Sequence, residues 1–533
     1  MKKKKYFELI AISLILAGML LSLLFAWVSS GFKQVSDWSS FWVVLLVCSG
    51  ILAAFWKAFK IENPPQALAY LLIGAWILRF ITGMIWFTTL PILGHGTPAE
   101  KAGYVMADAG SRDQAAWSLA KSEKPLWTAF RGNRKVDQYG GMLFISALVY
   151  RYLGSNVHQP LMMVMITAAV SSLAVLFTWA FARRAWNEKI AWLSVWILLL
   201  YPEAVLLGSS QMREAFFIVL VSAAFYGLVR FREKHDLTGI CWGLVPLLLL
   251  IPFSPPFAAL VTVLLLIAGL IAGTGLLKTR ISQPLFWLGL TALSFVILVS
   301  LYFALKQFTP ARIWNPIEMV AWWLRKSAHL QAFMSENASG WMQKIFDSSP
   351  QWTHFPMLLV YGIVQPFLPA ALVAGSYAPL WKWIAIWRSI GWTLALAFLV
   401  YTPFLAVRIK QNRRITMAII TVVWIVMIIA AVRGGSDQWD NPRYRAAFAG
   451  LACAIIGWTW IEHLRVGDPW LRRAFLSVAA ILIWFLPWYL RRYYSLEWTV
   501  IDPMRILGLG LATASLVVIW DWVSTQKNIC LPS

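Results

Sequence analysis

Residues 415–432 read ITMAIITVVWIVMIIAAV, an apolar run without a charged residue that lies between Arg413–Arg414 and Arg433. A helix of about 20 apolar residues is long enough to cross the hydrocarbon core of a bilayer. Apolar runs of similar length recur along the chain. In lipid, a backbone satisfies its hydrogen bonds only within helices or closed barrels. The sequence therefore predicts an all-α polytopic membrane protein.

The composition supports the same class. Of the 533 residues, 60% are hydrophobic and only 13% are charged, whereas a soluble domain has about 25% charged residues. The net charge of +23 would suggest nucleic acid as a partner in a soluble protein. Here the basic residues gather at the ends of apolar runs, which is the positive-inside pattern. We therefore expect the lipid bilayer as partner, and no nucleic acid.

The basic clusters set the predicted topology. With Lys2–Lys5, Arg183–Arg184 and Arg408–Arg414 inside, we expect about 14 transmembrane helices in the plasma (inner) membrane and both termini in the cytoplasm. The expected helices lie at about 7–31, 38–57, 66–91, 158–182, 188–207, 213–231, 237–252, 256–277, 281–305, 385–407, 415–432, 444–462, 471–490 and 505–524.

This topology divides the chain into four regions. We expect an N-terminal transmembrane hairpin at 1–65, a membrane core at 66–305, an external loop region at 306–384 and C-terminal transmembrane helices at 385–533. The core contains a large external loop, 92–138, followed by a short apolar helix at 139–153 that suits the membrane surface. Residues 357–380 are apolar but carry three prolines. We expect them to re-enter or lie flat, because a crossing would move Arg408–Arg414 outside.

Three polar clusters fall on the external side under this topology. Carboxylates can take a proton from an attacking hydroxyl, and arginines present a fork of donors that matches phosphate. A site built from both suits a substrate with a phosphate at the surface and a lipid tail in the bilayer. The clusters are Asp108/Arg112/Asp113, Arg213/Glu214 and Asp437/Asp440/Arg443/Arg445.

Each cluster also has a structural interpretation. In a helix Asp108 and Arg112 share a face, while Asp113 turns away by about 140°, so a solvated helix with one ion pair explains them too. Glu214 suits the N-terminus of a helix, and arginines beside it or in the third cluster can reach lipid headgroups. No metal-ligand spacing or Gly-rich phosphate loop occurs, so we expect no metal and no cofactor.

Residues 108–119 read DAGSRDQAAWSL. This stretch resembles the pattern Asp-Ala-x-x-Tyr-Asp-x-x-Ala-x-x-Leu in the first external loop of bacterial GT-C superfamily glycosyltransferases, which are related to the dolichyl-phosphate-mannose protein mannosyltransferases. It departs from the pattern at Arg112, where the family usually has an aromatic residue. Further similar segments, spread over 66–462, are LVYRYLG at 148–154, Arg183–Arg184, Tyr201–Pro202, Met212–Ala215, Gln365–Phe367 and Asn441–Arg445.

The resemblance implies a GT-C-like membrane fold and a hexosyltransferase that works on the external face. The donor would be a polyprenyl-phosphate sugar, and the acceptor an unknown glycan, lipid or protein hydroxyl. Asp108 would be the catalytic base, with Asp113 and Glu214 as supporting residues. The donor phosphate would be bound by Arg213, Arg443 and Arg445.

Two alternatives stay open from the sequence. An O-antigen-type polysaccharide polymerase or ligase would use a late-loop residue such as His329 or His354, and would tolerate substitution of Asp108. A lipid or solute transporter would favour charges within the membrane, of which Arg79 is one of few in this sequence.

Overall fold

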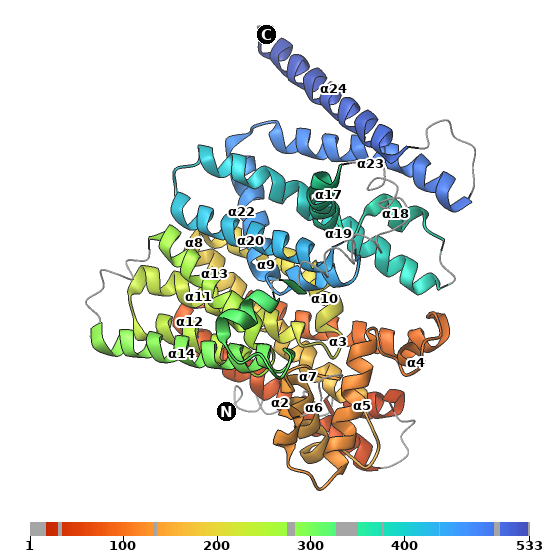
Figure 1. The fold of residues 1–533 in the computed structure, drawn as a ribbon, viewed down its shortest axis with the longest axis vertical. Coiled ribbons are helices and arrows are strands. Elements are labelled where there is room, and N and C mark those ends of the chain that lie inside the picture. Colours follow the sequence, from red (N-terminus) through yellow and green to blue (C-terminus); the bar gives the residue numbers. More distant parts are fainter. Residues whose placement is uncertain are drawn as a thin grey trace, which may run out of the picture.

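The computed structural model describes residues 18–29, 35–131, 136–273, 283–323, 325–326, 350–375, 378–435, 437–494 and 502–530. Lys2–Lys5 and His329 lie outside these ranges. The described residues form helices and no strand (Figure 1).

The first half contains a helix at Gly18–Ser29, α2 (Val35–Phe59), η1 (Lys60–Glu62), α3 (Gln66–Leu93), α4 (Pro98–Lys101), α5 (Ala107–Lys121), η2 (Leu126–Phe130), α6 (Gly141–Tyr152), α7 (Pro160–Ser172), α8 (Ala174–Ala185), α9 (Glu188–Leu200), α10 (Pro202–Gly208), α11 (Glu214–Lys234) and α12 (Leu237–Leu250). The second half contains α13 (Pro255–Ala272), α14 (Gln283–Lys306), α17 (Gln351–Val364), α18 (Leu368–Val373), α19 (Pro379–Arg408), α20 (Arg413–Gly434), α21 (Asp440–Ala446), α22 (Ala449–Val466), α23 (Trp470–Tyr494) and α24 (Pro503–Cys530).

Within the described ranges, 9 helices are long and apolar enough to cross a membrane. The number rises to 11 if each of two bent pairs counts as one span. These pairs are α9 with α10, bent by 58°, and α21 with α22, bent by 77°. The chain therefore has the all-helical architecture of a multi-pass membrane protein. The count of about 14 spans stays a prediction.

The centre of the protein is formed by α7, α8 and α11. In the most apolar part of the α7–α8 segment and of α11, 94% of the residues are buried. Helices α2, α3, α9, α12 and α22 pack around them (Figure 1). One hydrophobic core extends from Phe25 to Leu471 and includes side chains of α2 from the predicted N-terminal hairpin. The site described below is therefore held by elements far apart in the sequence.

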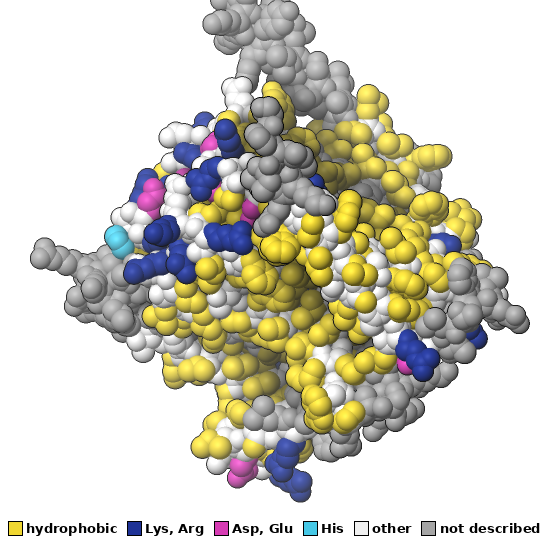
Figure 2. Space-filling model, turned by 90° about the horizontal axis from the view of Figure 1, so that it is seen from above, with side chains coloured by type: hydrophobic (Ala, Val, Ile, Leu, Met, Phe, Trp, Pro, Cys, Tyr) yellow, Lys and Arg dark blue, Asp and Glu magenta, His cyan; other side chains and the backbone are white. Residues whose placement is uncertain are grey.

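The outer helices present apolar side chains to their surroundings. On α3, Ile73, Ile77, Ile81 and Ile85 are each between 45% and 49% exposed. Their spacing of four residues places them on one stripe of the helix. Figure 2 shows the same property on a larger scale, with a broad hydrophobic surface and most Lys and Arg toward its edges. A surface of this kind is stable in lipid and costly in water.

The bend between α9 and α10 and the turn from α20 to α21, both near the predicted site, have local causes. Pro202 keeps Tyr201 extended (ψ 117°), because a residue before proline avoids the helical region. The chain therefore bends between α9 and α10. At the end of α20, a Cβ on Gly434 would lie 2.6 Å from the Cα of Asn441. Only glycine allows α21 to fold back this closely.

The segment expected to re-enter or lie flat contains two short helices. Helix α17 ends at Val364 and α18 spans Leu368–Val373, and a cis Gln365–Pro366 peptide bond separates them. Neither helix reaches the length of a membrane crossing. Whether residues 357–380 cross the bilayer stays a prediction.

Candidate functional site

Three helix ends meet around the guanidinium group of Arg443, which lies on α21. Its Nη2 atom is 2.9 Å from Oδ2 of Asp108, in the first turn of α5. Its Nε atom is 2.7 Å from Oε1 of Glu214, the first residue of α11. Its Nη1 atom is 3.7 Å from Oδ1 of Asp440. The structure thus brings together members of all three polar clusters that the sequence analysis singled out.

Arg112, one turn further along α5, links Asp108 to two more groups. Its Nη2 atom lies 3.6 Å from Oδ2 of Asp108, as the four-residue spacing predicts. Its Nε atom lies 3.7 Å from Asp137, and its Nη1 atom donates to the carbonyl oxygen of Gln211 at 3.4 Å. Asp137 was not predicted, because nothing in its local sequence distinguishes it from other loop carboxylates. We call Asp108, Arg112, Asp137, Arg213, Glu214, Asp440 and Arg443 the Asp108 cluster.

The cluster has an exposed layer and a buried layer. The side chains of Asp108 and Asp440 are 39% and 50% exposed, whereas that of Glu214 is only 3% exposed. Oε2 of Glu214 and Nε of Arg213 are buried and have no hydrogen-bond partner among the described residues. Arg213 reaches Glu214 only at 3.8 Å. Arg213 can therefore donate, and Glu214 can accept, one more hydrogen bond close to the accessible carboxylate of Asp108.

Chemically, the cluster offers two complementary groups at one surface. The half-exposed carboxylate of Asp108 can accept a proton from a hydroxyl that comes within hydrogen-bond distance. The guanidinium groups of Arg443 and Arg213 can bind an anion with the directed donors of a planar fork. Four carboxylates face three arginines here. Within the described ranges, no group of three or more His, Cys, Asp or Glu side chains is placed to hold a metal ion.

Asp113 lies on another face of α5 and belongs to a different cluster. Its carboxylate accepts hydrogen bonds from the hydroxyls of Tyr104 and Tyr150, both at 2.5 Å. It also lies 2.8 Å from Nε2 of His158, whose ring stacks on Trp117. Burial and the charge of Asp113 raise the pKa of Tyr104 well above its ordinary value, so this phenol stays a hydrogen-bond donor. These contacts anchor α5, the helix that also carries Asp108.

Substitution of Asp113 should destabilise the protein. We expect Asp113→Ala to lower the free energy of unfolding by about 2–4 kcal/mol, because two buried hydroxyls would lose their acceptor. The thermal midpoint of the purified protein in detergent measures this change. Gln114→Ala, at an exposed position on the same helix, is the control and should leave the midpoint unchanged. Equal midpoints for both variants would contradict the anchoring role.

Arg445 is not part of the Asp108 cluster. It is buried, its guanidinium lies 3.2 Å from the centre of the Trp392 ring, and it donates to the carbonyl oxygens of Ile363 and Gln365. Positions 443 and 445 are two residues apart, which separates their side chains by about 200° around a helix. That spacing, visible in the sequence, already argues against both arginines facing one ligand.

Two further arginines, Arg388 and Arg79, are buried. Arg388 of α19 donates to Oε1 of Glu203 at 2.8 Å and stacks on Trp439. Arg79 of α3 is 1% exposed, and its three guanidinium nitrogens have no hydrogen-bond partner among the described residues. It lies against Gly208, where a Cβ would be 2.9 Å from Nε of Arg79. An arginine without a partner inside a membrane helix is costly.

Replacement of Arg79 should therefore stabilise the protein. We expect Arg79→Met to raise the free energy of unfolding by about 1–3 kcal/mol, because an uncompensated charge is exchanged for an apolar chain of similar length. Arg230→Met is the matched comparison, since Arg230 is equally buried but paired with Glu62 and Asp236 at 2.6 Å. Its thermal midpoint should fall. A fall of similar size for Arg79→Met would show instead that a bound group neutralises Arg79.

In comparisons with known proteins, no family model matches the chain and no curated protein matches it.

Proposed function

We propose that this protein is a membrane glycosyltransferase of the GT-C type that moves a sugar from a polyprenyl-phosphate donor to an acceptor hydroxyl. The observation that carries the proposal is the contact between the half-exposed carboxylate of Asp108 and the guanidinium of Arg443. The contact joins a proton acceptor on the polar helix α5 to a cationic group on α21, which leads into the apolar helix α22. A donor with a phosphate at the membrane surface and a lipid tail needs this combination.

In the proposed reaction Asp108 is the base. The acceptor oxygen attacks the anomeric carbon of the sugar, and its proton passes to the Asp108 carboxylate. The bond between the anomeric carbon and the phosphate oxygen breaks, and the phosphate leaves with the electron pair. The products are the glycosylated acceptor and the polyprenyl phosphate. Charge develops on the leaving phosphate oxygen, where fixed cationic donors stabilise the transition state.

The arginines of the Asp108 cluster suit the stabilisation of the leaving phosphate. Arg443 is held between Asp108 and Glu214. A donor phosphate that binds Arg443 would take the place of Asp108 and leave its carboxylate free for the acceptor hydroxyl. Glu214, which is buried, would keep Arg443 in position during this exchange. Arg213 would supply a second cation, whereas the guanidinium of Arg445 is occupied by main-chain carbonyl groups.

The membrane arrangement belongs to the same proposal. We place the Asp108 cluster on the external face of the plasma membrane, with about 14 spans and both termini in the cytoplasm. The acceptor class, whether glycan, lipid or protein, stays open. A transporter is the second candidate, and the observation that favours it is Arg79, a buried cation without a partner among the described residues.

Sugar transfer by the purified protein tests the proposal. The protein in detergent is mixed with a radiolabelled polyprenyl-phosphate sugar and an envelope extract as a source of acceptors. We expect label in the acceptor fraction and a matching release of polyprenyl phosphate. Release without an acceptor product would indicate hydrolysis. Movement of the intact donor across proteoliposomes, without cleavage, would support transport and contradict the transferase.

A further inference from the structure

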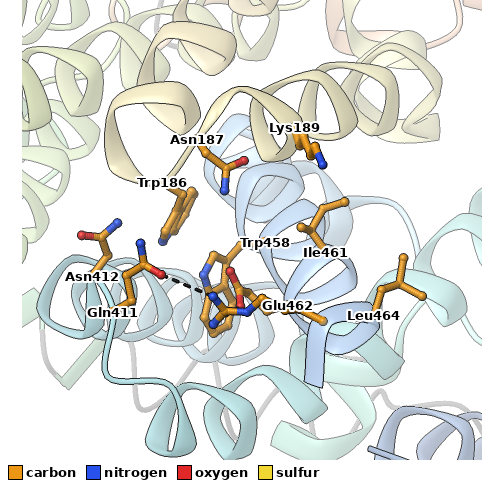
Figure 3. A pocket seen from close by; sticks show the side chains of 10 residues that line it. Trp186, Asn187, Lys189, Gln411, Asn412, Trp458, Ile461, Glu462 and Leu464 are labelled. Carbon is orange, nitrogen blue, oxygen red and sulfur yellow. Dashed lines mark hydrogen bonds and ion pairs between the residues drawn. The ribbon is translucent and has the colours of Figure 1, made fainter. Parts of the chain in front are cut away.

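A cavity lies at the N-terminal end of α20, away from the Asp108 cluster. Its volume is about 540 Å³, and Figure 3 shows that residues from three parts of the chain surround it. These parts are the turn between α8 and α9, the turn between α19 and α20, and the C-terminal end of α22. Helix α20 runs from this cavity to the Asp108 cluster, and its 22 residues span roughly 33 Å.

The chemistry of the lining favours an anion. Lys189 and Arg465 are exposed cations at the cavity, and Glu462 is its one acid. Glu462 lies 2.7 Å from Nη2 of Arg465, so its charge is already balanced and the lining keeps a net positive charge. Arg413 and Arg414, both exposed, follow directly in the chain and raise the local positive potential.

Neutral donors accompany these cations. Asn187, Gln411 and Asn412 line the cavity with amide groups, which can hydrogen-bond phosphate or hydroxyl oxygens. Asn187 and Asn412 also precede α9 and α20, so two helix N-termini border the cavity and add partial positive charge. Gln411 already accepts a hydrogen bond from Nη1 of Arg465 at 3.4 Å, which orients this arginine.

One part of the cavity wall is apolar. Trp186 and Trp458 stand close together, with ring centres 6.3 Å apart, and Trp458 is almost fully buried. Leu464, at the edge of the lining, is 65% exposed. A ligand with a polar phosphate and an apolar remainder would therefore contact both kinds of surface at the end of the membrane helices.

We propose that this cavity binds a phosphate-bearing anion, with the phosphodiester of an anionic phospholipid headgroup or a free phosphate as the two sources. Lys189 and Arg465 bind the phosphate oxygens, and the amides of the lining bind the remaining polar atoms. This site is independent of the proposed glycosyl transfer, because it shares no residue with the Asp108 cluster.

Native mass spectrometry of the full chain in a neutral detergent tests the proposal. The probes are short-chain phosphatidylglycerol, short-chain phosphatidylcholine and inorganic phosphate. We expect phosphatidylglycerol to bind more tightly than phosphatidylcholine. If inorganic phosphate competes with it, the site takes phosphate from either source; if not, the lipid headgroup is the ligand. Equal binding of the two lipids, or binding of neither lipid nor phosphate, would overturn the proposal.

Charge-removing variants locate the binding. Lys189→Gln with Arg465→Gln should weaken phosphatidylglycerol binding by about tenfold or more, since two cations near the phosphate are lost. The matched control is Lys57→Gln with Lys234→Gln, two exposed lysines outside the cavity lining. Equal weakening by both pairs would show a general effect of surface charge and would overturn the site.

The single variant Lys189→Gln separates a loss of binding from a loss of folding. Because Arg465 also pairs with Glu462, its removal can disturb α22. Lys189→Gln leaves that pair intact and should still weaken binding, with an unchanged thermal midpoint. Lys189→Arg keeps the charge and should retain binding. Full binding by Lys189→Gln would remove Lys189 from the site and contradict the proposed arrangement.

Discussion

Asp108→Asn is expected to reduce sugar transfer by a factor on the order of 10²–10⁴, the usual contribution of a general base. Asparagine has the same shape and can still accept a hydrogen bond from Arg443. It cannot take up the proton of the acceptor hydroxyl. The initial rate of label transfer from the radiolabelled donor to the acceptor fraction measures the effect.

This loss should occur without loss of folding. The side chain of Asp108 is 39% exposed, and ion pairs at such positions contribute at most about 1 kcal/mol. The thermal midpoint of Asp108→Asn should therefore stay close to that of the wild type. Asp502→Asn is the matched control, because Asp502 is 51% exposed and has an arginine at 3.9 Å. Its rate should equal the wild-type rate. Equal rates for Asp108→Asn and Asp502→Asn would exclude Asp108 as the base.

Arg443→Met has the second large expected effect, on stability as well as on transfer. The carboxylate of Glu214 is buried and its closest ion pair is with Arg443, at 2.7 Å. Removing one partner of a buried pair leaves an uncompensated charge and costs about 3–5 kcal/mol. The thermal midpoint should fall accordingly. Arg408→Met is the control, since Arg408 pairs with Asp468 at 2.8 Å but is 50% exposed. It should cost no more than about 1 kcal/mol.

A double variant separates the two consequences of losing Arg443. Adding Glu214→Gln to Arg443→Met removes the uncompensated negative charge at position 214 and should restore most of the thermal midpoint. Transfer should stay reduced by a factor on the order of 10²–10³, because the group proposed to stabilise the leaving phosphate is still absent. Recovery of both stability and transfer would show that Arg443 serves only to balance Glu214, and would remove it from the proposed mechanism.

The local parts of the site were predictable from sequence. The pairing of Asp108 with Arg112 follows from a spacing of four residues in a helix. The separation of Asp113 from Asp108 follows from the same geometry. Asp137 could not be predicted, because its contact with Arg112 depends on how the loop before α6 packs against α5. The separation of Arg443 and Arg445 by about 200° around a helix was also predictable, and it argues against one phosphate contacting both arginines, as the family resemblance implies.

By itself the sequence determined the class of protein and the surface at which polar groups gather. Long apolar runs become membrane-length helices because lipid leaves the backbone no other way to satisfy its hydrogen bonds, and charged residues then collect at helix ends. Only the tertiary structure decided which of these groups meet. Arg443 contacts Asp108 across 335 positions of the chain and Glu214 across 229. Such contacts depend on the packing of α7, α8 and α11, on the bend between α9 and α10 at Pro202 and on the turn from α20 to α21 at Gly434. No local pattern encodes that packing, because it results from the shapes of many side chains together.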